Sequence, residues 1–449
     1  MKVLLTVHQF FPEFSAGTEV LTLSVANALI ARGHEVIILT GYPANDVLTD
    51  AERTDDYLYE GIRVYRFLHS YVPMGGQTSK IEIGFDNHLA ADFFGRLLVE
   101  FKPDVVHFFH LNRLGTGLID KAVAAGVPAF YTPTDFWSVC PTAQLLRCGG
   151  RACAGPSPDA GNCAIHFAAN MLGDRVGKLI TAVPDVFSDY LVRIARSPLM
   201  PSVSFVQELR ALDGRLERNV NRLNVLHRIF APNKMIEELL LRHGVRKDIL
   251  VRSPYGINLD LAVVPRERNG GTRPLRLGFI GTLAPHKGCH VLLQALQGLS
   301  SSDINLKIYG KQTDFPEYAA RLRQLAGDNA SVEFCGTFPN NEIFGVFGQL
   351  DALVVPSVWN ENTPLVVYSA QAAGCPVVAS DVPGIAEVVA DGVDGLLFEP
   401  GSASELERAL RRLLDCPGLL AGLALNSKSP KSVSSYVDEL LDAWHSAVN

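Results

Sequence analysis

Short apolar runs alternate along the chain with longer stretches whose apolar residues recur at helical spacing. The first run spans residues 2–7. The helical stretch 19–31 follows it and ends at Arg32-Gly33, a typical helix exit, before a second run at 35–40. Further runs recur at residues 105–109, 129–132, 275–280, 306–309, 352–355 and 376–379. Strands that alternate with helices predict an α/β protein whose parallel sheets are covered on both faces.

One segment interrupts this rhythm. Residues 259–274 place prolines and glycines among charges, and the strand-loop-helix pattern restarts at Leu275. The pattern therefore predicts an N-terminal domain over 1–258 with a cysteine-rich loop and helical insertion at 140–230, a linker over 259–274, a C-terminal domain over 275–430 and a C-terminal helix over 431–449.

The composition narrows the class of protein. Of 449 residues, 47% are hydrophobic and 19% charged, which is enough to bury a large core, and the formal net charge of −7 provides no global attraction for nucleic acid. No apolar run approaches the roughly 20 residues that span a bilayer, and the opening MKVLLTVHQFF is too short for a signal peptide. We therefore expect a cytoplasmic protein.

Basic residues gather in the helical insertion, at Arg215, Arg218, Arg222 and Arg228. We interpret this run as a solvated helix face rather than a binding patch. In the wider region 215–246, basic residues flank an apolar helix, which leaves open a peripheral contact with the inner face of a membrane. A plain solvated helix is the favoured interpretation there.

Two strand-to-helix loops in the C-terminal half carry candidate chemistry. After the strand at 275–280, a loop presents Lys287, whose flexible ammonium group is suited to a phosphate; the alternative is an ordinary exposed loop lysine. There is no Walker A pattern. The segment PSVWNENTPLVVYSAQAAGCPVVAS places Glu361 just before a helix that Pro364 begins and Asn362 or Thr363 caps. Such a helix start can bind a diphosphate, while Glu361 accepts hydrogen bonds from sugar hydroxyls; the alternative is a capping carboxylate without a ligand.

Several segments share their order with a known family. They are GTEVLTLSVANALIARGHEV, PDVVHFFHL, SPYGINLD, GFIGTLAPHKG, VEFCGTF, DALVVPS and ENTPLVVYSAQAAGCPVVAS. This order, over essentially the whole chain, resembles the retaining GT-B glycosyltransferases of family 4, the glycosyl transferases group 1. The resemblance implies two Rossmann-like domains facing a cleft, with a C-terminal helix returning to the N-terminal domain. It also implies transfer with retention and without a catalytic metal, in cell-surface polysaccharide or related biosynthesis.

The resemblance also implies substrates and site residues. The donor is a nucleotide sugar, with UDP, GDP or another nucleotide, and the acceptor is a glycan or a lipid-linked molecule. Lys287 resembles the family's diphosphate-binding lysine, Glu361 the first glutamate of its glutamate pair, and Gly17 its N-terminal donor-loop glycine, although Gly17 alone is equally typical of a tight turn. Asp135 is the expected contact, or weak base, for the acceptor hydroxyl. The donor site is expected to comprise Gly17, Gly256, Gly281, Thr282, Lys287, Glu361, Asn362, Thr363, Pro364, Leu365 and Ser369.

Three positions depart from the family pattern. Ser369 replaces the second glutamate, Thr282 replaces a basic residue, and Thr134-Asp135 replaces a His-Asp pair. His107 or His110 is a candidate to supply the missing imidazole. These departures keep two other functions open: a catalytically weakened binding or partner subunit, and a sugar-nucleotide epimerase.

Four cysteines crowd one short loop, at Cys140, Cys148, Cys153 and Cys163. Four thiols among glycines and prolines can form a tetrahedral zinc site that orders such a loop, although their spacing is not the usual CxxC pair. Reduced cysteines, or disulfides in an oxidising compartment, are the alternatives. Similar loops in a subset of the resembling family favour a structural role on the acceptor side.

Overall fold

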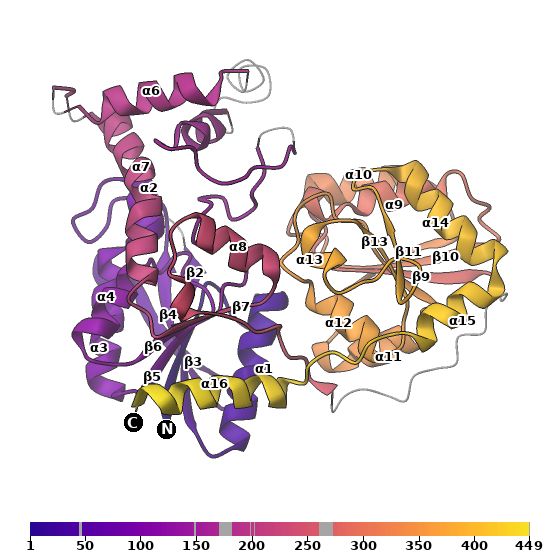
Figure 1. Cartoon of the computed structure of the whole chain (residues 1–449), viewed down its shortest axis with the longest axis horizontal. Coiled ribbons are helices and arrows are strands. Elements are labelled where there is room, and N and C mark those ends of the chain that lie inside the picture. The colour runs from indigo at the N-terminus through magenta and orange to yellow at the C-terminus, as the bar shows by residue number, and fades with distance from the viewer. Residues whose placement is uncertain are drawn as a thin grey trace. The chain divides into compact units, whose positions relative to one another are not determined.

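The computed structural model describes residues 1–44, 47–147, 150–169, 182–197, 199–201, 203–259 and 273–448 (Figure 1). Contacts divide the chain into two compact units. The N-terminal unit comprises Met1–Pro232, Ile236–Ser253 and Val437–Asn449, and the C-terminal unit comprises Asn233–Met235 and Pro254–Tyr436. Most of the predicted linker, residues 260–272, lies outside the described residues.

The described part of the N-terminal unit contains one eight-stranded sheet in the order β3-β4-β2-β1-β5-β6-β7-β8, parallel except for the β3–β4 pair. Its strands are β1 (Lys2–Val7), β2 (Glu35–Pro43), β3 (Thr54–Tyr59), β4 (Ile62–His69), β5 (Val105–Phe108), β6 (Ala129–Tyr131), β7 (Arg228–Ala231) and β8 (Leu250–Arg252). Its helices are α1 (Gly17–Ala31), α2 (Lys80–Phe85), α3 (His88–Phe101), α4 (Gly117–Ala124), α6 (Asp185–Ala195), α7 (Ser204–Leu223), and most of α8 (Lys234–Arg242) and of α16 (Val433–Val448).

The first β-α-β unit forms as its sequence predicts. Every residue of β1 after Lys2 is buried, because the strand lies between β2 and β5 with helices on both faces of the sheet (Figure 1). Helix α1 ends before Gly33, which has the left-handed φ of +82° that a glycine helix exit requires. Residues 437–448 of α16 group with this unit: Asp438 pairs with Arg32 at 2.9 Å, and the Trp444 ring lies 5.6 Å from that of His107.

The C-terminal unit contains, within its described residues, a six-stranded parallel sheet in the order β11-β10-β9-β12-β13-β14. The strands are β9 (Leu275–Ile280), β10 (Ile304–Tyr309), β11 (Val332–Gly336), β12 (Ala352–Val355), β13 (Val377–Ser380) and β14 (Gly395–Phe398). The helices are α9 (Cys289–Leu296), α10 (Pro316–Ala326), α11 (Ile343–Gly348), α12 (Leu365–Ala372), α13 (Pro383–Ala386), α14 (Ala403–Asp415) and α15 (Pro417–Leu425). Its core joins β9 and β10 to α9 and α14, so the α/β prediction is confirmed.

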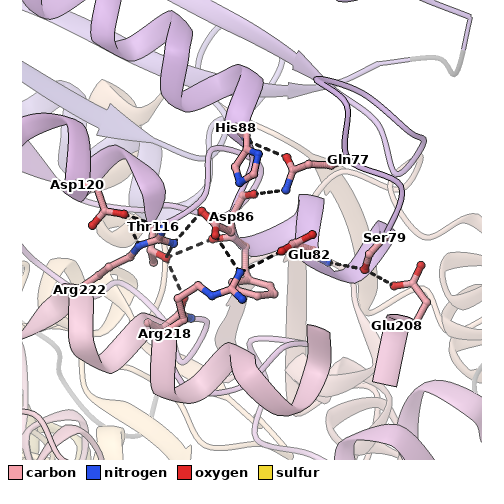
Figure 2. A network of polar contacts seen from close by, with 12 residues as sticks. Gln77, Ser79, Glu82, Asp86, His88, Thr116, Asp120, Glu208, Arg218 and Arg222 are labelled. Atoms are coloured by element: carbon pink, nitrogen blue, oxygen red, sulfur yellow. Dashed lines mark hydrogen bonds and ion pairs between the residues drawn. The ribbon is translucent and has the colours of Figure 1, made fainter. Parts of the chain in front are cut away.

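The arginines of α7 do not form a solvated face, and that prediction is wrong. Arg215 is buried and donates to the backbone carbonyls of Val139 and Trp137. Arg218 and Arg222 bind a shared carboxylate, Asp86, at 3.0 and 2.8 Å (Figure 2). Buried and half-buried charges need such partners to offset lost hydration.

Further ion pairs connect α7 to the neighbouring helices. Arg218 pairs with Glu82 of α2, and Arg222 pairs with Asp120 of α4. Glu208 of α7 accepts from the Ser79 hydroxyl (Figure 2) and from the backbone N–H groups of Lys80 and Ile81, where α2 begins. Helix α7 is therefore fastened to the sheet's covering helices, and these arginines are engaged within the protein.

None of the helices in the described part of the chain is long and apolar enough to cross a membrane.

Candidate functional site

Two loops of the C-terminal unit are held together by a close backbone approach. The short helix Pro285–Lys287 follows β9 and ends at Gly288, whose φ is +71°. A Cβ atom on Gly288 would lie 1.7 Å from the carbonyl oxygen of Pro356, directly after β12. The N–H of Val358 also donates to the carbonyl of His286 at 2.9 Å. Only glycine fits this contact, which brings the loops after β9 and β12 side by side.

The approach places Lys287 against Glu361. The lysine Nζ lies 2.8 and 3.0 Å from the two carboxylate oxygens. Oε1 also accepts from the Ser357 hydroxyl at 2.6 Å and the Trp359 indole N–H at 2.9 Å. The Lys287 side chain is 24% exposed and that of Glu361 only 5%. Lys287 is therefore not the ordinary exposed lysine of the alternative interpretation, and Glu361 is not a helix cap.

Electrostatics favour the ionised form of Glu361. Burial alone would raise the pKa of this carboxyl, but the charge of Lys287 and the hydrogen bonds from Lys287, Ser357 and Trp359 outweigh it and hold the pKa below its usual value. Next to the pair, burial and then the Lys287 charge lower the pKa of His286 to about 4, so this imidazole is neutral at pH 7. The site thus pairs one anion with one cation, and the cation is the more accessible of the two.

The predicted caps of the following helix are wrong. Pro364 occupies the N-cap position of α12, and no side chain of the described residues caps it. Asn362 and Thr363 instead accept hydrogen bonds from the Asn233 amide at 2.9 and 3.1 Å, and Asn362 donates to the Tyr255 hydroxyl. The reason is local: the residue before a proline is biased away from helix, and Thr363 has a φ of +38°. These side chains hold the loop that carries Glu361.

Other residues expected at the donor site lie in three places in the C-terminal unit. Gly281 and Thr282 follow β9, where the Gly281 N–H bonds to the carbonyl of Tyr309 and the Thr282 carbonyl accepts from Ala284. Gly256 packs against the backbone of residues 432–433, which leaves no room for a side chain. Ser369 donates its hydroxyl proton to the Leu365 carbonyl at 3.1 Å, one turn back in α12. That hydroxyl is therefore already engaged within α12.

In the N-terminal unit a His-Asp pair is assembled from two adjacent strands. His110 follows β5 and Asp135 follows β6, and parallel strands bring these carboxyl ends to one edge of the sheet. The His110 Nε2 lies 2.8 Å from Asp135 Oδ2. Because the Asn112 N–H donates to His110 Nδ1, the proton belongs on Nε2 and is donated to Asp135. The structure thus places the imidazole of His110 beside Asp135, although 25 positions separate the two residues in the sequence.

His107, the other candidate imidazole, has a different environment. It is fully buried, its Nε2 lies 2.9 Å from the Thr132 hydroxyl, and burial lowers its pKa to about 3. It therefore belongs to the core. Asp135 is more accessible, and its second oxygen accepts from the Trp137 N–H at 2.7 Å.

Two polar residues beside this pair were missed by the sequence analysis. The His8 ring lies 4.1 Å from that of His110, and the His8 Nε2 lies 3.7 Å from Glu19 Oε1. Burial raises the pKa of Glu19, and hydrogen bonds from neighbouring backbone amides and from Gln9 offset only part of this rise. Burial also lowers the pKa of His8. Glu19 lies in the first turn of α1, which Gly17 opens. Their positions, directly after β1 and at the start of α1, are the signal that could have indicated them.

The cysteine loop is only partly described. Cys140, Cys153 and Cys163 are free thiols, while Cys148 lies outside the described residues. Within the part of the chain that the structure describes, no group of three or more His, Cys, Asp or Glu side chains could hold a metal ion. Burial, followed by the nearby Cys140 and Cys153, raises the pKa of Cys163 to about 12. The zinc site with Cys148 stays a prediction.

Two family models match the chain, as a glycosyl transferase 4-like domain over residues 16–173 and as glycosyl transferases group 1 over residues 274–416. A 2-deoxystreptamine glucosyltransferase from Streptomyces kanamyceticus is 34% identical over 31% of this chain and 36% of its own length. A D-inositol 3-phosphate glycosyltransferase from Corynebacterium aurimucosum is 35% identical over 37% of this chain and 43% of its own length. The chain thus spans less than half the length of these relatives.

Solved structures share the fold along the whole chain. HepE of Anabaena, in complex with UDP-glucose, superposes with a TM-score of 0.63 at 17% identity, covering 99% of this chain and 100% of that one. Sucrose-phosphate synthase from Thermosynechococcus elongatus gives 0.60 at 16% identity, covering 100% and 96%. At these identities the likeness shows the fold alone. The two domain matches together cover more than half of the sequence and place this chain in the group 1 glycosyltransferases, and the likeness to the solved structures shows the GT-B fold of two Rossmann-like domains.

Proposed function

We propose that this protein transfers a sugar from a nucleotide-sugar donor to a hydroxyl of a glycan or lipid-linked acceptor, with retention of configuration. The observation that carries the proposal is the Lys287–Glu361 pair with its Ser357 and Trp359 donors. Lys287 is partly accessible, and Ser357 and Trp359 also hold Glu361. Lys287 can therefore leave Glu361 and bind the diphosphate when a nucleotide sugar binds. The glucosyltransferase among the relatives and the UDP-glucose complex of HepE support a nucleotide-sugar donor, with UDP the first to test.

In the proposed mechanism, the Lys287 ammonium binds the diphosphate and stabilises the negative charge that develops as the diphosphate leaves. Glu361, still held by Ser357 and Trp359, accepts hydrogen bonds from the transferred sugar. The backbone N–H groups at the start of α12 face the same leaving group, with Gly17, Gly256, Gly281 and Thr282 lining the donor. No metal ion is required for these steps.

We assign the acceptor hydroxyl to Asp135. Both of its oxygens already accept a hydrogen bond, from His110 and from the Trp137 N–H, and these contacts fix the orientation of the carboxylate. Its main role is therefore to orient the attacking hydroxyl, and His110 acts as its positioning residue. A cytoplasmic location and a role in cell-surface polysaccharide or related biosynthesis belong to the same proposal.

A thermal-shift panel of nucleotide sugars tests the donor assignment, with Lys287→Ala and Glu361→Ala as site variants. Lys311→Ala is the matched control, because Lys311 is an exposed lysine of the same unit that pairs with Asp314. We expect one nucleotide sugar to raise the melting temperature of the wild type and of the control but not of Lys287→Ala. If none stabilises the wild type, the proposal fails.

A second candidate is a donor-binding partner subunit with little activity of its own. The specific observation in its favour is Ser369, whose hydroxyl is turned onto the Leu365 carbonyl and not toward a ribose. This candidate predicts donor stabilisation without turnover. Release of nucleoside diphosphate together with a transferred sugar, measured on the purified protein with candidate acceptors, decides between the two.

A further inference from the structure

Arg113 is an arginine of the N-terminal unit that has no carboxylate partner, although it is half-buried. It follows β5, and its Nη1 donates to the His8 carbonyl and to the side-chain oxygen of Gln9, both at 3.0 Å. Among the described residues it forms no ion pair. Burial lowers the pKa of the guanidinium, and the nearby Tyr71 and Glu19 offset only part of this effect. A cation held away from water in this way needs an anion as its partner.

The backbone at Arg113 and a neighbouring strand are both adapted to this side chain. Arg113 has a φ of +68°, in the left-handed region that residues other than glycine rarely adopt. A Cβ atom on Gly41 of β2 would lie 2.8 Å from the Arg113 Cβ and 3.5 Å from its Cδ. The arginine therefore reaches from the end of β5, past the residue that follows β1, to β2, and a side chain at position 41 would displace it. Strained residues of this kind cluster at sites that hold a ligand.

The hydrogen bonds of Arg113 leave one edge of its guanidinium group unused. Both acceptors take Nη1, so the N–H groups of Nε and Nη2 have no hydrogen-bond partner among the described residues. These groups form the parallel pair of donors with which arginine binds a carboxylate or a phosphate through two hydrogen bonds. The protein thus holds the guanidinium by one nitrogen and keeps its bidentate edge for another partner.

A second polar group near Arg113 also lacks partners. His69 ends β4 and is only 2% exposed, and neither of its ring nitrogens has a hydrogen-bond partner among the described residues. Burial, followed by the charges of Arg113 and Arg53, lowers its pKa to about 3, so the ring is neutral at pH 7 and carries one donor and one acceptor. Its ring meets that of Tyr71 edge-on, with 4.8 Å between the centroids. Buried polar groups nearly always have partners, so this imidazole and the unpaired guanidinium mark a place where a ligand can supply them.

We propose that Arg113 binds an oxyanion of the acceptor, a phosphate or a carboxylate, through Nε and Nη2, with His69 and Tyr71 beside it. The carboxyl ends of the parallel strands β4, β5 and β6 bring these residues to the same edge of the sheet as Asp135. An acceptor anchored by its anionic group at one point of this edge can present a hydroxyl to Asp135 at another. Assigning the anion to the acceptor rests on the proposed function, whereas the binding of an oxyanion does not.

A thermal-shift series on the full chain tests the binding of an oxyanion, with sodium phosphate and sodium acetate compared with sodium chloride at equal ionic strength. Lys287→Ala is the background protein, because it lacks the cation of the proposed donor site. In this background Arg113→Gly is the site variant, since glycine readily adopts the φ of +68° at this position. The matched control is Arg96→Ala, at an exposed arginine of α3 without an ion pair among the described residues.

We expect phosphate or acetate to raise the melting temperature of the background protein and of the control by about 3 °C at ten times its dissociation constant, and to leave that of Arg113→Gly unchanged. The anion that stabilises the protein identifies the group as phosphate or carboxylate. Arg113→Lys, which keeps the charge but not the bidentate edge, should retain only part of the shift. The inference is wrong if neither anion stabilises the background protein more than chloride does, or if Arg113→Gly responds as the control does.

The thermal-shift panel of nucleotide sugars leaves Arg113 intact, so failure of this inference and failure of the proposed function can be told apart. If no nucleotide sugar stabilises the wild type but an oxyanion still binds through Arg113, the transferase function fails and the oxyanion site stands. In the sugar-transfer assay, Arg113→Lys should raise the KM for an anionic acceptor by about tenfold and leave the KM for the donor unchanged. A rise confined to the KM for the donor would overturn the assignment of the anion to the acceptor.

Discussion

Replacing Lys287 by methionine preserves most of the side-chain volume but removes the cation next to Glu361. Among the contacts described, the carboxylate then keeps Ser357 and Trp359 as donors. Removing one partner of a buried ion pair costs about 3–5 kcal/mol, and the 24% exposure of Lys287 reduces this through solvent screening. We expect the unfolding free energy of the C-terminal unit to fall by about 2–3 kcal/mol at neutral pH.

The pH dependence identifies the cause. In the wild type the Glu361 pKa is held below its ordinary 4.5, so the stability from this group is present above that pH and is lost as pH falls through the folded-state pKa. Without Lys287, burial dominates and raises the pKa, so the ionised carboxylate destabilises the variant at neutral pH and protonation relieves it. The difference between the two proteins should be large at about pH 8 and small at about pH 4.

Denaturant unfolding followed by tryptophan fluorescence measures this difference, since Trp359 lies beside the pair. Lys287→Met with Glu361→Gln should regain most of the loss, because glutamine can still accept from Ser357 and Trp359. Lys311→Met, at an exposed pair, should change the unfolding free energy by less than about 0.5 kcal/mol. An equal loss at both pH values, or no recovery in the double variant, would refute the buried-charge explanation.

Three other predictions concern the N-terminal unit. His110→Phe and Asp135→Asn should each lower the kcat of sugar transfer by about 10²-fold with little change in the KM for the donor. His88→Gln, at an exposed histidine, is the control. A change confined to the KM for the donor would contradict the assignment of this pair to the acceptor. Arg222→Met should cost about 2–4 kcal/mol in thermal unfolding of this unit because it removes one cation from the buried Asp86; an unchanged melting temperature would show that Arg218 alone suffices. The raised pKa of Cys163 predicts that its thiol is alkylated much more slowly at pH 7 than that of the exposed Cys416, which peptide mass spectrometry can measure. If acid instead releases about one zinc ion per chain, and Cys163→Ser lacks this zinc, the zinc site in the cysteine loop is supported.

Periodicity predicted the central strands of both sheets, whose sequence is dictated by burial on both faces. It missed six strands toward the edges of the sheets: β3, β4, β7, β8, β11 and β14. The residues of β3, TDDYLY, are mostly accessible on an antiparallel edge and form no apolar run. The α7 arginines were misinterpreted for a related reason. Helical spacing locates a charged face on α7. It does not show that carboxylates from three other segments cover that face: Glu82 of α2, Asp86 in the loop before α3, and Asp120 of α4.

The candidate site shows the same limit. Lys287 and Glu361 could each be chosen from loop position and family resemblance, but their 2.8 Å contact joins residues 74 positions apart and depends on the approach of two backbones. His110 was one of two candidate imidazoles, and spacing alone could not separate it from His107. Their partners separate them, because both are buried but His107 contacts the Thr132 hydroxyl, while His110 lies after the strand end and donates to Asp135.

The contact at Gly288 has a consequence for exchanging parts between related enzymes. Because the Pro356 carbonyl occupies the space of a side chain at Gly288, each loop is shaped to the other. If only the β12–α12 loop is moved into a relative, its carbonyl meets whatever residue the relative has at the position equivalent to Gly288. If only the β9–α9 loop is moved, its glycine faces a backbone that is not shaped to it. The two loops therefore make one transplantable module, and altering donor preference by recombination should require moving both.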